Sequence, residues 1–269
     1  MRRLFVFCEL LVVFACLSPL AQSAPYTAKV QVVPYTIRRA EPPAVNATAE
    51  ELEKAGDQLR SEEAYLDALD YYRAALQKKP ENAQLYNKVG IVELQMERYK
   101  QARKDFEKSI KLDRTFASTY NNLGAVYYGE KRYGAAIKQY QKAIKLEPGV
   151  ATFYSNIGAA YFAKKEFEPA GIHYAKAMEL DPDILERRSR NGISAQFQSS
   201  DELARYAFVL AKLYARTGAI DRSLVYLKRA IEEGYEGIEK VYKDSEFAAL
   251  RKDPRFADLM VAKPMALPK

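Results

Sequence analysis

Histidine and cysteine, which often act as bases, nucleophiles and metal ligands in enzymes, are scarce in this chain of 269 residues. It has one histidine, His173, and its two cysteines, Cys8 and Cys16, both lie close to the N-terminus. A histidine-based triad or a metal cluster needs several partners in one place, and the sequence concentrates none around His173. The adjacent glutamates at 50–51 and 62–63 fit the solvated surface of a helix. We therefore predict that the chain is not an enzyme and binds no metal and no cofactor.

Amide side chains are better placed to do binding chemistry. Asn122 and Asn156 are 34 residues apart, and an asparagine amide offers the donors and the acceptor that can hold the backbone of an extended peptide. Leu94, Tyr128 and Phe162 follow one another at the same spacing and could seat apolar side chains. A common spacing puts such residues on a common face only if the chain itself repeats with that period.

The chain does repeat with that period. Glycine returns every 34 residues, and an aromatic residue nine positions later, an alanine twelve positions later and a second aromatic residue sixteen positions later return with it. The glycines are Gly56, Gly90, Gly124 and Gly158, and the second aromatic residues are Tyr72, Phe106, Tyr140 and Tyr174. A fixed period of this length indicates stacked supersecondary units rather than one irregular core.

This register resembles the tetratricopeptide repeat, a helix-turn-helix unit of the same length. We place four repeats at 49–82, 83–116, 117–150 and 151–184. Small residues at the glycine and alanine positions let two antiparallel helices approach closely. Pro80, Pro148 and Pro182 mark boundaries between units, because proline cannot continue a helix. The resemblance implies an all-α fold, a right-handed superhelical solenoid of helix-turn-helix repeats with a C-terminal helical cap.

The rest of the repeat region departs from the period. Residues 204–237 are predicted to form a degenerate fifth repeat, in which Ala211 replaces the usual glycine. Residues 185–203 break the period and form either a solvated linker, which we favour, or a projecting binding element. Residues 238–269 are predicted to form the cap and a frayed tail, since an array must cover its last apolar face.

By resemblance, the first helix of each repeat lines the concave side of the solenoid. The candidate partner-binding residues on that side are Asn87, Lys88 and Leu94, then Asn121, Asn122 and Tyr128, and then Ser155, Asn156 and Phe162. The alternative is that the asparagines cap helices or bond to neighbouring units. The carboxylate clamp of chaperone-binding arrays is not matched, because Ser118 and Thr152 stand at the places of its basic residues.

The N-terminal residues predict where the protein works. Residues 1–23 have the layout of a secretory signal peptide, with a basic start, an apolar run and small residues before a cleavage point at Ala24. The alternatives are an uncleaved membrane anchor and lipidation of Cys16. Residues 24–48 are rich in proline and are predicted to be a tether into the repeats. We expect an exported protein of the periplasm, the cell envelope or the medium, with membrane contact only through the two alternatives.

Charge gives weaker indications. The formal net charge is +7, and lysines recur on the predicted second helices. We expect a solvated basic face, and contact with anionic polymers or lipid headgroups is the alternative. Nucleic acid is not an expected partner, because an exported protein rarely meets it.

Together these features predict a protein-interaction module. Its concave groove would bind a peptide or a helix of a partner protein through a few apolar anchors and amide contacts. The alternative function is an envelope assembly factor, of the secretion or pilus type, that docks through its convex face or its ends. Both functions imply a protein or peptide partner, and the sequence leaves the oligomeric state open.

Overall fold

The computed structural model describes residues 39–186 and 199–262. The predicted signal peptide at 1–23, most of the predicted tether at 24–48, the centre of the 185–203 insertion and the tail after Ala262 lie outside the described residues. The chain divides into two compact units, Met1–Arg39 and Ala40–Lys269, and everything below concerns the second unit.

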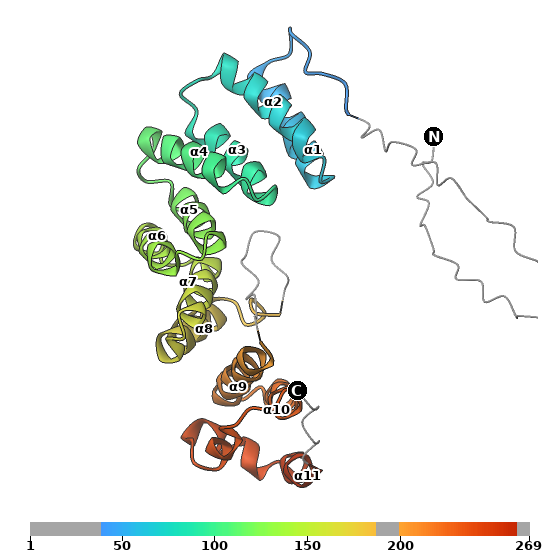
Figure 1. Ribbon diagram of the computed structural model, residues 1–269, viewed down its shortest axis with the longest axis vertical. Coiled ribbons are helices and arrows are strands. Elements are labelled where there is room, and N and C mark those ends of the chain that lie inside the picture. Colours follow the sequence, from blue (N-terminus) through green and yellow to red (C-terminus); the bar gives the residue numbers. More distant parts are fainter. Residues whose placement is uncertain (1–38, 187–198, 263–269) are drawn as a thin grey trace, which may run out of the picture. The chain divides into compact units, whose positions relative to one another are not determined.

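The second unit is a succession of helices that pack in consecutive pairs (Figure 1). The first four pairs are α1 (Ala49–Ser61) with α2 (Tyr65–Lys78), α3 (Ala83–Gln95) with α4 (Tyr99–Leu112), α5 (Ala117–Gly129) with α6 (Tyr133–Leu146), and α7 (Ala151–Ala163) with α8 (Phe167–Leu180). A fifth pair is α9 (Ser200–Arg216) with α10 (Ile220–Glu232). Each second helix of the first three pairs also packs against the first helix of the next pair. The predicted all-α solenoid of helix pairs is confirmed.

Each pair closes through one residue in the left-handed backbone region. In the first four repeats this residue is Glu63, Glu97, Lys131 or Lys165, with φ between 56° and 65°. In the fifth repeat it is Gly218, with a φ of 78°. A side chain in this region costs about 1 kcal/mol, so four of the five turns carry a strain that the fifth avoids.

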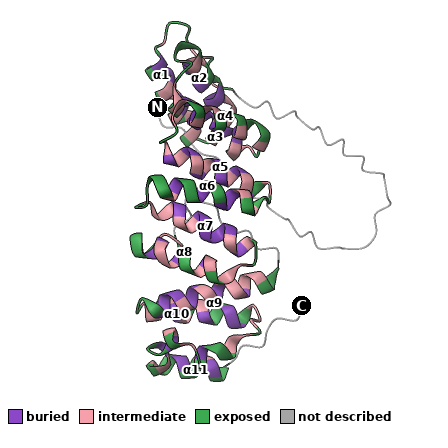
Figure 2. Ribbon diagram, turned by 90° about the vertical axis from the view of Figure 1, so that its left-hand side faces the viewer, coloured by how far each residue is buried: buried purple, intermediate pink, exposed green. Residues whose placement is uncertain are grey.

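The recurring glycines allow the two helices of a repeat to touch. Tyr140 is fully buried, and a Cβ added at Gly124 would lie 2.5 Å from Cε1 of its ring. The other three glycines meet the buried ring of their own repeat in the same way, at 2.6 to 2.8 Å. Buried residues accordingly recur in every helix pair (Figure 2). The glycine is therefore required by the ring opposite it, because a Cβ and the ring would occupy the same space.

The fifth repeat solves the same packing problem with different residues. Ala211 replaces the glycine and Leu227 replaces the ring, and both are fully buried. The added methyl group and the smaller partner offset each other in volume. The period is thus maintained by complementary volumes rather than by identical residues.

The C-terminal cap consists of three short 3-10 helices and one α-helix. These are η1 (Ile238–Tyr242), η2 (Ser245–Phe247), η3 (Leu250–Lys252) and α11 (Pro254–Ala262). Their side chains Val241, Phe247 and Leu250 pack against Ala207 and Phe208 of α9 in one buried cluster. The cap therefore covers the apolar face of the last repeat, as the sequence predicted.

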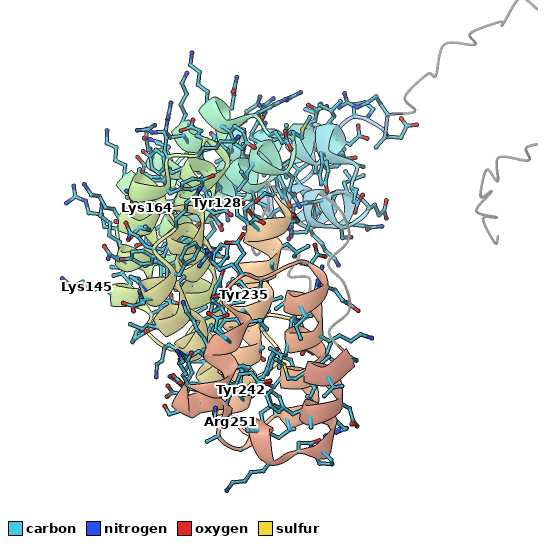
Figure 3. The ribbon with its side chains drawn as sticks, turned by 60° about the horizontal axis from the view of Figure 1, so that its bottom comes forward. Tyr128, Lys145, Lys164, Tyr235, Tyr242 and Arg251 are labelled. Carbon is cyan, nitrogen blue, oxygen red and sulfur yellow. The ribbon has the colours of Figure 1, made fainter. Side chains whose placement is uncertain are left out.

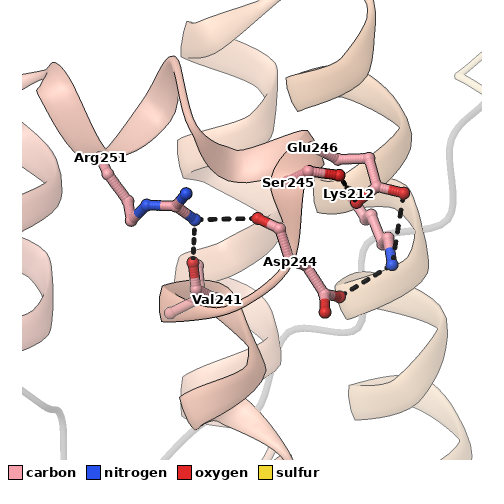
Figure 4. A network of polar contacts seen from close by, with 6 residues as sticks. All are labelled: Lys212, Val241, Asp244, Ser245, Glu246 and Arg251. Carbon is pink, nitrogen blue, oxygen red and sulfur yellow. Dashed lines mark hydrogen bonds and ion pairs between the residues drawn. The ribbon is translucent and has the colours of Figure 1, made fainter.

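Polar contacts fix the course of the cap (Figure 4). Arg251 donates hydrogen bonds to the carbonyl oxygens of Val241 and Asp244, at 2.8 and 2.9 Å. Lys212 of α9 pairs with the carboxylates of Asp244 and Glu246, at 2.8 and 3.5 Å. The first contact holds the turns of the cap together, and the second ties them to the fifth repeat.

Candidate functional site

The nine candidate residues lie on the first helices α3, α5 and α7. Besides packing against their own second helices, α3 contacts α5 and α5 contacts α7 directly. We call the side of α3, α5 and α7 that carries the candidate residues the first-helix face. It is the surface on which partner binding was predicted.

Four asparagines of this face are hydrogen-bonded to one another. Nδ2 of Asn156 donates to Oδ1 of Asn121 at 2.8 Å, and Nδ2 of Asn122 donates to Oδ1 of Asn87 at 3.0 Å. Nδ2 of Asn121 completes the chain with a longer contact of 3.4 Å to Oδ1 of Asn122. The amides therefore link three successive repeats.

Burial separates these asparagines from an open binding surface. Asn87, Asn121 and Asn156 are 6, 5 and 1% exposed, whereas Asn122 is half-buried. A buried amide must satisfy its donors and acceptor within the protein, and bonding between repeats does so. Three of the four asparagines are thus placed in the packed interface between units, the alternative considered for them from the sequence, and Asn122 alone of the four retains substantial surface.

Lys88 is held by the preceding repeat. Its ammonium group lies 2.6 Å from the Glu53 carboxylate and 2.7 Å from that of Asp57, both on α1. Asp57 also accepts a hydrogen bond of 2.7 Å from the hydroxyl of Tyr72. This network ties the first two repeats together through α1 and α3, as the asparagines tie the next ones.

The three apolar candidates, Leu94, Tyr128 and Phe162, are largely buried. Tyr128 and Phe162 are 7 and 5% exposed. Their rings pack against Tyr133 and Phe167 at centroid distances of 5.3 and 5.1 Å. Leu94 is the half-buried member of the three.

Ser155 is also half-buried, and its hydroxyl donates to the Thr152 carbonyl oxygen of its own helix at 3.1 Å. The candidate residues that keep accessible surface are therefore Lys88, Leu94, Asn122 and Ser155.

His173 is a packed residue on α8. Its ring stacks on Tyr161 at a centroid distance of 5.3 Å and an interplanar angle of 5°, with Tyr154 at 6.2 Å. Burial lowers the pKa of the His173 imidazole below its ordinary value, which favours the neutral form at pH 7. The stacking gives this histidine a structural role.

An acidic cluster lies between the first two repeats and was not predicted. Glu93 stands where later repeats have Tyr127 and Tyr161, and its side chain is 1% exposed. Its carboxylate pairs with Arg73 at 2.7 Å and, more weakly, with Arg98 at 3.5 Å. Burial and then the neighbouring Glu93 raise the pKa of the Asp105 carboxyl to about 6, against the lowering influence of Arg73 and Lys104.

A pocket of about 530 Å³ lies where α8, α9 and the cap meet. Sequence reasoning missed it. Three residues of its wall, Phe208, Val209 and Lys212, stand 53 residues after Ser155, Asn156 and Ala159, which is one period plus a 19-residue interruption. Adding this offset of 53 residues to the candidate positions on α7 would have predicted that these α9 residues line a binding surface. The wall built by the cap had no such signal.

The pocket combines apolar walls with charged groups. Apolar side chains come from α8, α9 and the turn after α10, namely Phe167, Ile172, Phe208, Val209, Leu213 and Tyr235. The charged groups are the cations Arg205, Lys212, Arg216 and Lys240 and the carboxylates Glu168, Asp244 and Glu246. An apolar cavity of this volume with a few convergent polar groups is typical of a ligand site.

The described part of the chain has neither a metal-binding cluster nor a membrane-spanning helix. In residues 39–186 and 199–262 no group of histidine, cysteine, aspartate and glutamate side chains is arranged to hold a metal ion. No helix within these ranges is long and apolar enough to span a bilayer.

Comparison with protein families supports the tetratricopeptide repeat over residues 83–183. The family model described as tetratricopeptide repeat matches residues 83–148 and 115–183. No curated protein matches the chain.

Several solved structures are similar. A crystal structure of MamA protein is 23% identical over 73% of this chain and 95% of its own, with a TM-score of 0.49. MamA 41-end from Desulfovibrio magneticus RS-1 is 26% identical over 51% of this chain and 77% of its own, with a TM-score of 0.46. The first tetratricopeptide repeat domain of Spaghetti (RPAP3), bound to an HSP90 peptide, is 20% identical over 48% of this chain and 94% of its own, with a TM-score of 0.38.

Proposed function

The chain is a tetratricopeptide repeat protein, and we propose that it is an interaction scaffold that binds a segment of a partner protein along the first-helix face. Stacked repeats of this kind present extended surfaces that suit protein binding. The observation that carries the proposal is the asparagine chain that links α3, α5 and α7. It fixes the relative positions of three helices before any partner arrives, so binding loses less conformational entropy.

Asn122 is the central contact in this proposal. Its amide donates one hydrogen to Asn87 and accepts one bond from Asn121, which leaves one hydrogen and one lone pair. These are the groups needed to pair with the N–H and C=O of an extended backbone. Half-buried Leu94 and Ser155 lie on the neighbouring first helices and supply the side-chain contacts.

Two matched substitutions, each replacing an alanine with glutamate, test the proposal. Ala125→Glu places a charge on α5, one turn after Asn122, and Ala135→Glu places the same charge on the second helix α6. Both alanines are half-buried helix residues. We expect proteins captured from a cell extract by the wild-type chain to be lost with Ala125→Glu and retained with Ala135→Glu, at unchanged helicity for both variants. Equal retention or equal loss in the two variants would contradict the proposal.

The second candidate function is docking of a large assembly, such as secretion or pilus machinery, through the second helices. It is favoured by the lysines of α6, a helix without acidic residues. Lys138, Lys142 and Lys145 make no ion pair within the described residues, and Lys145 projects away from the helices (Figure 3). If this function is the correct one, Lys138→Glu with Lys145→Glu abolishes partner capture and Ala125→Glu does not.

We also propose that the protein is exported, on the strength of the signal-like residues 1–23. Intact mass spectrometry of the protein from its native host tests this. A chain beginning at Ala24 is expected. A chain beginning at an acylated Cys16 would indicate a lipoprotein, and an intact N-terminus would indicate a retained anchor or no export.

A further inference from the structure

We infer that the pocket between α8, α9 and the cap binds an acidic peptide segment of a partner protein, with an apolar side chain inside the pocket and carboxylates on its basic groups. This inference rests on the proposed scaffold function and adds the chemistry of the partner. The pocket lies at the fifth repeat, away from the first-helix face of α3, α5 and α7.

The walls of the pocket are built to receive an apolar group. Phe208 stacks on Tyr235 at a centroid distance of 4.4 Å and an interplanar angle of 27°, which joins α9 to the turn between α10 and η1. Ile172 of α8 is 68% exposed although it lies in the pocket wall. Covering exposed apolar surface next to fixed aromatic rings is the usual source of affinity in such a site.

Arg205 is positioned to bind a carboxylate. Its guanidinium carbon lies 4.5 Å from the centroid of the Phe167 ring and 5.7 Å from that of Tyr235. Rings that contact the face of a guanidinium group orient it and leave the N–H donors at its edge available for a bidentate carboxylate. Arg205 makes no hydrogen bond or ion pair within residues 39–186 and 199–262.

Two further cations of the pocket lack an acidic partner. Neither Arg216 nor Lys240 forms an ion pair with any described residue, and both are exposed. Lys212 differs, because Asp244 and Glu246 already neutralise it.

The unpaired charges of the lining are therefore three cations and one carboxylate, Glu168. The charge that complements this arrangement is negative.

Neither of the two segments outside the described structure that follow residue 186 offers that charge, and residues 1–38 contain one acidic residue, Glu9, against four basic residues. Residues 187–198 contain three arginines and no acidic residue. Residues 263–269 contain two lysines and no acidic side chain. Charge complementarity thus favours a segment from another protein over either of these segments.

Peptide selection with a charge-matched control tests the inference. Random 12-residue peptides displayed on phage are selected on the full chain, and the strongest are synthesised and titrated by fluorescence anisotropy. We expect sequences with aspartate or glutamate on both sides of an aromatic or aliphatic residue.

Arg205→Gln should weaken their binding about tenfold or more, the loss expected for a bidentate charged pair. Arg229→Gln removes the same charge from the exposed side of α10 and should leave the affinity unchanged. Ala125→Glu should also leave it unchanged, so a failure of the first-helix proposal is distinguishable from a failure here.

Several results would overturn the inference. They are the absence of any selected peptide, selected peptides without an acidic excess, and equal losses for Arg205→Gln and Arg229→Gln. A tenfold gain in affinity on deleting residues 263–269 would show that the chain's own tail occupies the pocket, and would overturn it as well.

Discussion

The first four repeats and the fifth repeat use the same architecture with different residues. In the first four, a glycine faces a buried ring, as Gly124 faces Tyr140. In the fifth, Ala211 faces Leu227. The residue with a left-handed backbone in the turn between the helices also differs. It has a side chain in the first four repeats, as at Lys131, and is Gly218 in the fifth. The comparison teaches that the repeat conserves volume and backbone shape, and that different residues can satisfy both.

The surfaces of the two regions differ as well. In the first four repeats, polar groups of one first helix bond to the neighbouring first helix, as Asn156 does to Asn121. At the fifth repeat, after the 19-residue interruption, the residue equivalent to Asn156 is Val209. It lies beside a pocket in which Arg205 has no acidic partner among the described residues. Regular stacking thus pairs polar groups between repeats, whereas the equivalent position of the fifth repeat is apolar and lines a pocket.

The largest expected effect on stability comes from disrupting the contact between the glycine and the ring. Gly124→Ala should lower the free energy of unfolding by about 2–3 kcal/mol, because the new Cβ forces the Tyr140 ring or α5 to move. Gly134→Ala is the control, since open space surrounds Gly134 on α6, and it should stabilise the protein by about 0.5–1 kcal/mol. Urea unfolding measures both. A stable Gly124→Ala variant would contradict the role assigned to the ring.

A second variant combination sharpens the same comparison. Adding Tyr140→Leu to Gly124→Ala recreates the Ala211–Leu227 pair of the fifth repeat in the third. The double variant should lose less stability than the sum of the two single variants, with a coupling of about 1 kcal/mol or more. Additive losses would show that the smaller side chain at position 140 does not compensate for the larger one at position 124.

The next effect concerns the link between repeats. Asn156→Ala should lower the free energy of unfolding by about 2 kcal/mol, because it leaves the amide oxygen of buried Asn121 without its donor. Ser155→Ala, on the same helix, removes only a bond to its own helix and should change stability by less than about 0.5 kcal/mol. Similar values for the two variants in urea unfolding would refute the linking role.

A smaller effect is expected at the turns. Gly218→Ala should lower the free energy of unfolding by about 1 kcal/mol, because alanine disfavours the left-handed backbone. Lys131→Gly should have the opposite sign and be worth about 0.5 kcal/mol. Thermal and urea unfolding would reveal the signs, and a stabilising Gly218→Ala would contradict this account.

The last effect depends on pH and arises between the first two repeats. Burial raises the pKa of Asp105 to about 6, from an ordinary value of 3.8. The folded state therefore holds this proton more tightly than the unfolded chain. The stability that the proton contributes is present below pH 3.8 and is lost as the pH rises through about 6.

Asp105→Asn removes the pH-dependent loss. The variant should melt higher than the wild type above pH 6, and the difference should shrink towards pH 4. Melting curves at a series of pH values test this. Glu107→Gln on the exposed side of α4 is the control and should show no such pH-dependent gap.

Much of the fold was predictable because it is periodic. Gly56 to Gly158 and their partner rings recur so regularly that the spacing indicates stacked units, and its resemblance to the tetratricopeptide repeat implies the helix pairs. The cap was harder, since residues such as Val241 and Phe247 lie in 3-10 turns of three to five residues that are too short to show a period. Their burial was predicted, but the turns that achieve it were not.

The candidate site was predictable only in part. The resemblance to the tetratricopeptide repeat placed Asn122 and Asn156 on first helices, where the structure has them, but it could not tell which amide stays accessible. That depends on which carbonyl or amide of the next repeat lies within hydrogen-bonding distance. The buried Glu93 and the pocket escaped prediction for the same reason, because each is made by residues of different repeats or by the cap.

The sequence by itself determined the repeat unit, its helices and the residue pairs within each unit, because these contacts join residues a fixed number of positions apart. The tertiary structure alone decided how successive units meet. It paired the asparagines, buried Tyr128 and Phe162, and placed Arg205 between two rings with no carboxylate partner in the described ranges. Contacts between units depend on how one helix pair lies on the next, and short-range spacing does not encode that geometry.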